Sequence, residues 1–344
     1  MSRPRVGLVG YGLAGRVFHA PLIEAEPDLD LAAIVTADGE RAAAAAARYP
    51  AVAVLGSVDA LFAADVDVDV VVIAAPTPRH AELAQRTIEA GRATVVDKPF
   101  AVRAADAERL AEAARRRGVL LTVFHNRRWD GDFLTVRRLV AEGALGDVWR
   151  FESRFEWTST RPRPPWKTGT AGRDGGGVAY DLGVHLLDQA IALFGPVADV
   201  YGELDVHRPG GANDDDCFLA VTHASGVRSH LAASSLVAQR GFRFRLLGPG
   251  GAYTKWGLDP QEAQLGQGLR PSDPGYGLEP ESGWGRLGRD GQTQTIPTER
   301  GGYPEFYRRL ALALAGRGNV PVRPEEAIEP IRIIESLHAR AARS

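Results

Sequence analysis

The 344-residue chain is poor in several kinds of residue, and each scarcity excludes a class of protein. Cys217 is its one cysteine, so an intrachain disulfide and a cysteine-rich zinc site are both excluded. No apolar run reaches the ~18 residues of a membrane span, and no secretory signal precedes the first apolar run. The formal net charge is −2, so no global field favours nucleic acid or anionic membrane. We therefore expect a cytoplasmic protein that binds neither.

Lysine is scarce too, because only Lys98, Lys167 and Lys255 among the 41 basic residues are lysines. In a chain that uses arginine almost everywhere, a lysine marks a position where arginine could not do the same chemistry. Arginine keeps its proton at working pH, whereas burial and neighbouring charge can tune lysine. Scarcity only selects candidates, and Lys98 alone lies in a motif that explains it.

The pattern of apolar residues changes along the chain, and at this length the change predicts two domains. From residue 5 to about residue 124, short apolar runs alternate with segments of helical period, and this pattern predicts an α/β Rossmann domain with a doubly wound parallel sheet. After about residue 150 the runs are longer, alternating and richer in aromatic residues, which predicts an α+β domain with a mainly antiparallel open sheet. We expect domains at 1–124 and 125–344, with the last helix packing back on the first domain.

The expected elements follow from the same patterns. In the first domain the expected strands are 5–9, 29–35, 68–74, 93–96 and 119–124, and the expected helices are 14–26, 40–49, 80–90 and 105–117. In the second domain the expected strands are 148–157, 197–206, 217–222, 228–235, 242–247 and 252–256, and the expected helices are 179–194, 304–315 and 324–342. The stretch 266–302 is rich in Gly, Pro, Asp and Ser and is expected to be a long surface excursion.

A glycine-rich turn follows the first expected strand and opens the first expected helix. Its sequence is Gly10-Tyr11-Gly12-Leu13-Ala14-Gly15. The first glycine permits a tight turn, the second lets a pyrophosphate approach the backbone, and the third lets the helix pack on the strand, while the helix N-terminus offers free N–H donors. With a strand before it and a helix after it, the turn predicts dinucleotide binding; a turn that binds nothing would not need all three glycines.

The end of the second expected strand bears on the choice of cofactor. An acidic residue for the ribose hydroxyls is expected about twenty positions after the glycine-rich turn, and Asp38 lies one or two positions later than that. Its carboxylate would favour NAD by repelling a 2′-phosphate, whereas Thr36 and Arg41 could bind that phosphate. The predicted cofactor is NAD or NADP, and the sequence does not decide between them.

Two further motifs carry groups suited to proton transfer. Lys98 follows an expected central strand at its carboxyl end, where ligands bind in open parallel sheets; the alternative is a surface lysine in a turn. Asp181 and His185 are four residues apart, so on a helix they share one face, and the preceding glycines 175–177 let another group approach that helix closely.

The Asp181/His185 pair has three interpretations. It could be a general acid/base in which the carboxylate stabilises the imidazolium, or a capping Asp beside a satisfied core His. It could also belong to a metal site, for which no third ligand lies nearby in the sequence, and we predict no metal.

These motifs together resemble those of the Gfo/Idh/MocA oxidoreductases, and the resemblance covers nearly the whole chain. The matching segments are the glycine-rich turn, Ala75-Pro-Thr-Pro-Arg-His80, Asp97-Lys-Pro99, His125-Asn-Arg-Arg-Trp-Asp130 and the Asp181/His185 segment. Segments 16–22, 126–129 and 180–189 look most like the scyllo-inositol dehydrogenase branch. Two departures stand out: the family's Glu-Lys-Pro is here Asp97-Lys98-Pro99, and NADP-preferring members of that branch carry Ser-Arg in place of Ala37-Asp38.

The resemblance implies an NAD(P)-dependent dehydrogenase or reductase that acts on a polyol, an inositol or a sugar. It implies that His185 takes the proton from a substrate hydroxyl, that Asp181 orients His185, and that Lys98 hydrogen-bonds the reacting oxygen. The expected cofactor-binding residues are Gly10, Tyr11, Gly12, Leu13, Ala14, Gly15, Thr36, Asp38, Pro76, Thr77, His80, Asp97, Lys98 and Asn126. The expected substrate-binding residues are Lys98, Arg127, Trp166, Tyr180, Asp181 and His185.

A cofactor-sensing regulator on the same fold is the alternative, but such a protein has no reason to keep a tunable lysine and an acid/base pair. The expected partners are the small-molecule substrate and further copies of this chain. An open sheet face that no helix covers would expose an apolar patch, and we therefore expect a homodimer or homotetramer.

Overall fold

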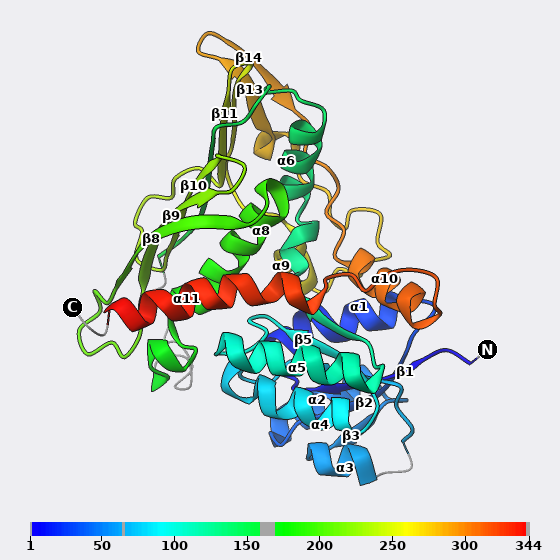
Figure 1. Cartoon of the computed structure of the whole chain (residues 1–344). Coiled ribbons are helices and arrows are strands. Elements are labelled where there is room, and N and C mark those ends of the chain that lie inside the picture. Colours follow the sequence, from blue (N-terminus) through cyan, green and yellow to red (C-terminus); the bar gives the residue numbers. More distant parts are fainter. Residues whose placement is uncertain (1, 64–65, 159–168, 342–344) are drawn as a thin grey trace. The chain divides into compact units, whose positions relative to one another are not determined.

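The computed structural model describes residues 2–63, 66–158 and 169–341, and Figure 1 traces the elements along the chain. They form two compact units. The first unit comprises Met1–Asn126, Gln261–Tyr276 and Gly302–Ile328, and the second comprises Arg127–Pro260, Gly277–Gly301 and Glu329–Ser344. The units are therefore not two continuous stretches of the kind we expected at 1–124 and 125–344.

The first unit contains a parallel sheet with the strand order β3-β2-β1-β4-β5-β6. Its strands are β1 (Arg5–Val9), β2 (Asp30–Val35), β3 (Ala53–Leu55), β4 (Val70–Ile73), β5 (Ala93–Asp97) and β6 (Leu121–Phe124). Strand order reverses between β1 and β4, where ligands bind in open α/β sheets. This confirms the Rossmann prediction. The strand β3 was missed because it has three half-buried residues at the sheet edge, too few to show a pattern.

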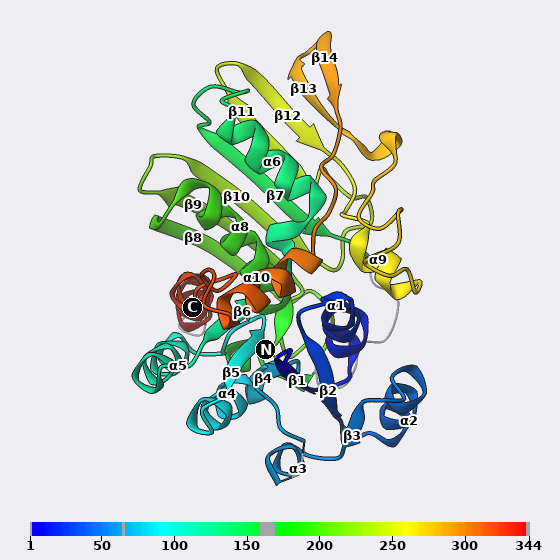
Figure 2. The same ribbon diagram turned by 90° about the vertical axis from the view of Figure 1, so that its right-hand side faces the viewer.

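Helices cover both faces of this sheet. They are η1 (Ala14–His19), α1 (Ala20–Ala25), α2 (Gly39–Arg48), α3 (Val58–Ala63), η2 (Thr77–Arg79), α4 (His80–Glu89) and α5 (Ala104–Arg117). Figure 2 shows α4 and α5 on one side of the sheet and α1 and α2 on the other. The helix α5 ends at Gly118, whose φ of 64° suits a left-handed cap.

Two late stretches of chain pack on the first unit. They contain α9 (Gln261–Gly266), α10 (Pro304–Leu314) and η7 (Pro324–Ala327). Phe306 and Tyr307 of α10 pack against Phe124 of β6, and the hydroxyl of Thr122 donates to the carbonyl of Val322. These buried contacts join residues about 200 positions apart, so no local pattern could assign the late stretches to this unit.

The second unit contains a mixed, mainly antiparallel sheet with the order β14-β13-β12-β11-β7-β10-β9-β8, in which β7 and β10 pair in parallel. This confirms the prediction of a mainly antiparallel open sheet. Its strands are β7 (Arg150–Glu156), β8 (Val197–Asp205), β9 (Asp216–His223), β10 (Arg228–Ser234), β11 (Phe244–Gly248), β12 (Gly251–Lys255), β13 (Gly285–Arg289) and β14 (Gln292–Ile296).

The hairpin β13–β14 corrects the expectation of a surface excursion at 266–302. The sequence did not reveal this hairpin because β13 is rich in glycine. Glycine is required at position 285, since an added Cβ there would lie 2.3 Å from the hydroxyl oxygen of Tyr253. A strand that has glycine where a neighbouring tyrosine needs the space lacks the alternating side-chain pattern by which strands are recognised.

The helices of the second unit are η3 (Asn126–Trp129), α6 (Gly131–Ala141), η4 (Gly172–Asp174), η5 (Ala179–Gly183), α8 (Val184–Phe194), η6 (Glu281–Gly283) and α11 (Ile328–Ala341). Figure 2 shows α6 and α8 over one face of the sheet. The helix α6 was not expected. In α11, Glu329 accepts a hydrogen bond from the backbone N–H of Val197. No helix in the described part of the chain combines the length and the apolar character needed to cross a bilayer.

Candidate functional site

The glycine-rich turn lies where three strands of the first sheet meet. Gly10 follows β1 with a φ of 102°, and its backbone N–H donates to the carbonyl of Val35 at the end of β2. An added Cβ on Gly10 would lie 2.4 Å from the carbonyl oxygen of Ala74, just after β4. The tight turn predicted for this glycine is therefore present, and only glycine fits it.

The other two glycines of the turn differ sharply in the space around them. An added Cβ on Gly15 would lie 2.0 Å from the carbonyl oxygen of Gly10, so this glycine lets the helix pack on the turn. Around Gly12 the nearest atom to an added Cβ is Nη1 of Arg41, at 3.8 Å. Leu13 is 61% exposed. The backbone is therefore open at the position where the sequence predicts the approach of a pyrophosphate.

A cavity of about 320 Å³, which we call the nucleotide cavity, adjoins this opening. The helix that follows the turn begins as the π-helical η1 and continues as α1, and π-turns are frequent at functional sites. Free N–H groups at a helix start, open glycine backbone and guanidinium groups are the donors that a dinucleotide requires, so the residues present fit this cofactor. The cavity is lined by Tyr11, Gly12, Leu13, Arg16, Glu40, Arg41 and Ala44.

Asp38 caps the helix α2. Its Oδ1 accepts the backbone N–H of Arg41 at 3.0 Å, and its Oδ2 lies 3.7 Å from Nε of the same arginine. The hydroxyl of Thr36 accepts the backbone N–H of Asp38. The carboxylate and the guanidinium that compete in the choice between NAD and NADP are therefore adjacent, at the edge of the nucleotide cavity.

Lys98 lies directly after β5, at the same edge of the sheet as the glycine-rich turn. Its backbone N–H donates to Oδ1 of Asp97 at 2.8 Å, and the Lys98–Pro99 peptide bond is cis. Burial opposes ionisation of Asp97, but the imidazole of His19 and the charge of Lys98 outweigh it and lower the pKa of this carboxyl. A stable anion therefore accompanies the lysine.

His19 is a buried residue that sequence reasoning did not place beside Asp97. Its Nε2 lies 3.8 Å from Oδ2 of Asp97, and its Nδ1 shares a 2.6 Å hydrogen bond with the hydroxyl of Tyr307 from α10. The imidazole therefore lies between Tyr307 and the aspartate next to Lys98. No sequence signal could have found it, because Tyr307 is 288 positions from His19.

His80 joins two loops at this edge of the sheet. Its ring nitrogens lie 2.7 Å from the carbonyl oxygens of Pro99 and Ala75, so the ring connects the loop after β5 to the loop after β4. Burial lowers its pKa, although Asp97 and the two carbonyls oppose the shift. Pro76 and Thr77 lie at the start of η2, just after β4, and His80 is buried.

In the second unit Asp181 and His185 lie on one continuous helix, formed by the π-helical η5 and by α8. Asp181 is partly exposed, and His185 is 3% exposed. The imidazole meets the ring of Phe155 edge-on, with centroids 6.4 Å apart, and the guanidinium of Arg127 lies 4.7 Å from the centroid of the same ring. The structure thus brings Arg127 and His185 together around one aromatic side chain.

Two arginines connect this helix to the rest of its unit. Arg128 forms a bidentate ion pair with Asp188 of α8, at 2.7 and 2.9 Å. Arg243 donates to Gln189, which in turn donates to the carbonyl of Arg127. Buried, paired charges of this kind hold a helix in one register.

The glycines at 175–177 let a carboxylate approach the start of this helix, as the sequence predicted. Oδ2 of Asp214 accepts the backbone N–H of Ala179 at 2.7 Å, and an added Cβ on Gly177 would lie 2.0 Å from Oδ1 of the same residue. Oδ1 lies 3.6 Å from Nε2 of His338, whose ring stacks on Tyr180 with 5.5 Å between centroids. Asp214 and His338 are further residues that sequence reasoning missed.

Replacing Asp214 with asparagine should remove a pH dependence from the stability. Burial raises the pKa of Asp214 to about 6, against about 3.9 in an unfolded chain. The unfolded state then binds fewer protons than the folded state between about pH 4 and pH 6. The free energy of unfolding therefore falls by ~3 kcal/mol as the pH rises through this window.

Urea unfolding at pH 4.5 and pH 7.5 checks this, because Asp214→Asn does not titrate while His338 is common to both proteins. The wild type should lose stability relative to the variant as the pH rises. Equal changes in the two proteins would contradict the role of the buried carboxyl.

The predicted residues divide between the two units. The cofactor group follows the carboxyl ends of β1, β2, β4, β5 and β6, where Asn126 comes after β6 and is buried. Arg127, Tyr180, Asp181 and His185 belong to the second unit. Tyr180 is buried in its stack with His338. Trp166 lies outside the described residues.

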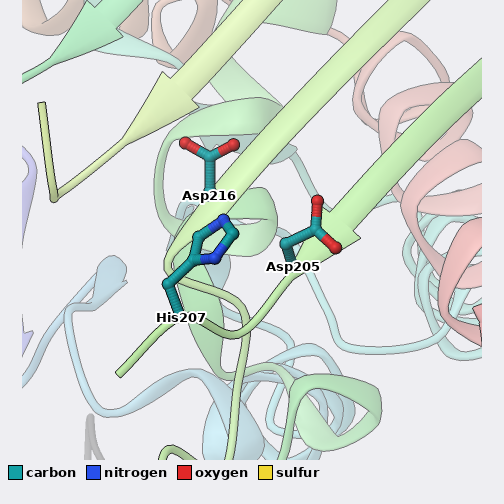
Figure 3. A group of neighbouring side chains, drawn as sticks. All are labelled: Asp205, His207 and Asp216. Atoms are coloured by element: carbon teal, nitrogen blue, oxygen red, sulfur yellow. The ribbon is translucent and has the colours of Figure 1, made fainter. Parts of the chain in front are cut away.

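One group of metal-binding side-chain types comes together among the described residues. Asp205, His207 and Asp216 place one ligand atom each within 4.8 Å of the others (Figure 3). Asp205 and Asp216 are paired across β8 and β9, and Asp205 and His207 are exposed. Exposed acidic groups are common without an ion, and this group includes neither Asp181 nor His185. That catalysis uses no metal stays a prediction.

Comparison with known proteins matches both parts of the chain. Residues 4–125 match the model of an oxidoreductase family with an NAD-binding Rossmann fold, and residues 133–254 match the GFO/IDH/MocA C-terminal domain. The chain is 40% identical to the uncharacterized oxidoreductase YdgJ of Escherichia coli, over 96% of this chain and 94% of YdgJ. It is 33% identical to the scyllo-inositol 2-dehydrogenase (NADP(+)) IolW of Bacillus subtilis, over 96% and 92%. The solved YPO2259 structure from Yersinia pestis is 39% identical, with a TM-score of 0.89 over 99% of this chain and 96% of that one.

Proposed function

Because the chain belongs to the Gfo/Idh/MocA family of NAD(P)-dependent oxidoreductases, we propose that it transfers hydride between nicotinamide and a polyol, an inositol or a sugar, or the corresponding ketone. It is a dehydrogenase or reductase that acts on CH–OH groups, and its cofactor is NAD or NADP. The relatives are named as oxidoreductases and dehydrogenases, which favours an enzyme over a cofactor-sensing regulator.

The proposed catalytic set is Lys98, Asp181 and His185. Bound nicotinamide supplies the hydride acceptor or donor at C4. In the oxidative direction His185 takes the proton of the substrate hydroxyl as the neighbouring C–H bond gives up its hydride, and Asp181 stabilises the imidazolium. Lys98 hydrogen-bonds the same oxygen and favours the alkoxide. In the reductive direction His185 returns the proton.

One observation carries the proposal for Lys98 furthest. Lys98 follows β5 at the sheet edge that also holds the glycine-rich turn, beside an Asp97 carboxyl whose pKa is lowered. A cation next to a stable anion at the ligand-binding edge of a parallel sheet is positioned to meet a reacting oxygen. The substrate class is supported by the relatives, among them scyllo-inositol 2-dehydrogenase, D-apiose dehydrogenase and inositol 2-dehydrogenase.

An absorbance assay of reduced nicotinamide tests the proposal. NAD and NADP are each supplied with a panel of inositols, aldoses and polyols, and NADH and NADPH with keto-sugars and inososes. Turnover of at least one member is expected. Tight cofactor binding without turnover across the whole panel would overturn the substrate class and return the regulator as the better hypothesis.

The choice between the two cofactors should respond to Asp38. Asp38→Ser removes the carboxylate but keeps a side chain that can cap α2. A like charge a few ångströms from a 2′-phosphate is worth ~1 kcal/mol or more near a surface, so the ratio of kcat/KM for NADP over NAD should rise about tenfold. Adding Arg41→Gln should reverse the gain. An unchanged ratio in Asp38→Ser would show that this carboxylate does not select the cofactor.

We also propose a homodimer or homotetramer. The strand β8 of the second sheet carries Tyr201, which is 59% exposed. A monomer in light scattering at micromolar concentration would refute the proposal. The cytoplasmic location stays a prediction.

A further inference from the structure

A second cavity in the first unit, of about 450 Å³, has no part in the proposed reaction. It lies between η1, α1 and the end of α2 on one side and the segment 265–272 on the other. It shares Tyr11, Arg16 and Ala44 with the nucleotide cavity, so the two hollows adjoin. Its volume is within the ~300–1,000 Å³ range of small-molecule sites.

Two tyrosines that line this cavity have hydroxyls with no hydrogen-bond partner among the described residues. Tyr11 is 3% exposed and Tyr49 is 5% exposed, and both line the cavity. Neither hydroxyl hydrogen-bonds to another described residue, yet neither is fully shielded from solvent. A buried hydroxyl without a partner costs free energy, so these two groups are arranged to meet water or a ligand. Burial raises both pKa values, which keeps the hydroxyls protonated as donors at neutral pH.

The charge around the cavity is mainly positive. Arg16 and Arg270 line it, and the guanidinium of neither forms an ion pair or hydrogen bond with any other described residue. Arg48 also lines it and is neutralised by Glu24 at 3.3 Å. Two uncompensated guanidinium groups beside two phenol donors form a site for phosphate or carboxylate oxygens.

The remaining wall is apolar. It is formed by Pro21, Leu265, Leu269 and Pro271. A bare inorganic ion would leave this surface in water, whereas an ion with a carbon skeleton would cover it. We propose that the cavity binds a small organic anion, a phosphate ester or a polycarboxylate, at a site separate from that of the nicotinamide cofactor.

Calorimetric titration of the full chain with small anions tests this proposal. The chain is first saturated with NADH, or with NADPH where that binds more tightly, so that the filled nucleotide site cannot take the anion. The probes are phenyl phosphate, citrate and inorganic phosphate at constant ionic strength, with benzyl alcohol as the uncharged control. Phenyl phosphate or citrate should bind one to one and at least tenfold more tightly than inorganic phosphate. The tighter of the two identifies the chemical class.

Variants locate the binding. Arg270→Gln should weaken the organic anion at least tenfold, and Tyr49→Phe, which keeps the ring and removes the hydroxyl, several-fold. The matched control is Arg103→Gln, an exposed arginine of the same unit outside the cavity, which should change nothing. The proposal would be overturned if neither organic anion bound. Equal affinities in the wild type and the three variants would overturn it as well.

The outcome is separable from that of the proposed function. If neither dinucleotide binds, the proposed function fails at the saturation step. The same anion titration without cofactor then still tests the cavity, because Arg270 and Tyr49 line this cavity and not the nucleotide cavity.

Discussion

Replacing Lys98 with arginine is expected to lower kcat by about 10²–10⁴-fold while the dissociation constant of the dinucleotide stays within a few-fold. Arginine preserves the positive charge beside Asp97, so the loop after β5 should keep its structure. What the variant loses is a compact ammonium whose hydrogen bond to the reacting oxygen can strengthen as that oxygen becomes an alkoxide. Steady-state turnover and fluorescence titration of reduced nicotinamide measure the two quantities.

Lys255 supplies the matched control, because the structure explains this lysine without catalysis. Its ammonium is fully buried in the second unit, forms a 2.9 Å ion pair with Glu279 and donates to the carbonyl of Trp256. The larger guanidinium overfills that space, so Lys255→Arg should cost ~1–3 kcal/mol of stability and leave kcat within a few-fold. Turnover that stays within a few-fold of the wild type in both variants would mean that Lys98 has no special role, and His185→Ala should then be the only inactive variant of the set.

The second large effect is expected in the glycine-rich turn, where two similar substitutions should fail differently. In Gly15→Ala the new Cβ would lie 2.0 Å from the carbonyl oxygen of Gly10, and both atoms belong to the backbone, so the turn must move. Overpacking of this kind costs ~1–3 kcal/mol or more. We expect a lower melting temperature together with loss of dinucleotide binding.

Gly12→Ala places its methyl group 3.8 Å from the nearest atom, so the unfolding free energy should change by less than ~1 kcal/mol. The methyl group occupies the space by which a pyrophosphate reaches the backbone, and the dinucleotide dissociation constant should rise at least tenfold. Urea unfolding and nucleotide titration of the two variants separate stability from binding. Tight nucleotide binding by Gly12→Ala would show that the cofactor does not approach the backbone there.

The scarcity of lysine is now only partly a sign of function. Lys98 sits beside a lowered-pKa carboxyl at the ligand edge of the sheet, but Lys255 persists because its buried ion pair with Glu279 has room for an ammonium. Lys167 lies outside the described residues. Two scarce lysines of one chain therefore lie in different surroundings, and composition alone could not separate the two cases.

The amino-acid sequence by itself determined the parallel-sheet domain, the glycine-rich turn and the positions of Lys98, Asp181 and His185 along the chain, because each of these is recorded in residues close together in sequence. Only the tertiary structure decided what holds those groups. The chain from Tyr307 through His19 to Asp97, the Asp214 carboxylate under the start of η5 and the strand hidden in the glycines of β13 all depend on partners that no local pattern names. Buried hydrogen bonds and close packing select such partners by their position in space, and that position exists only once the chain has folded.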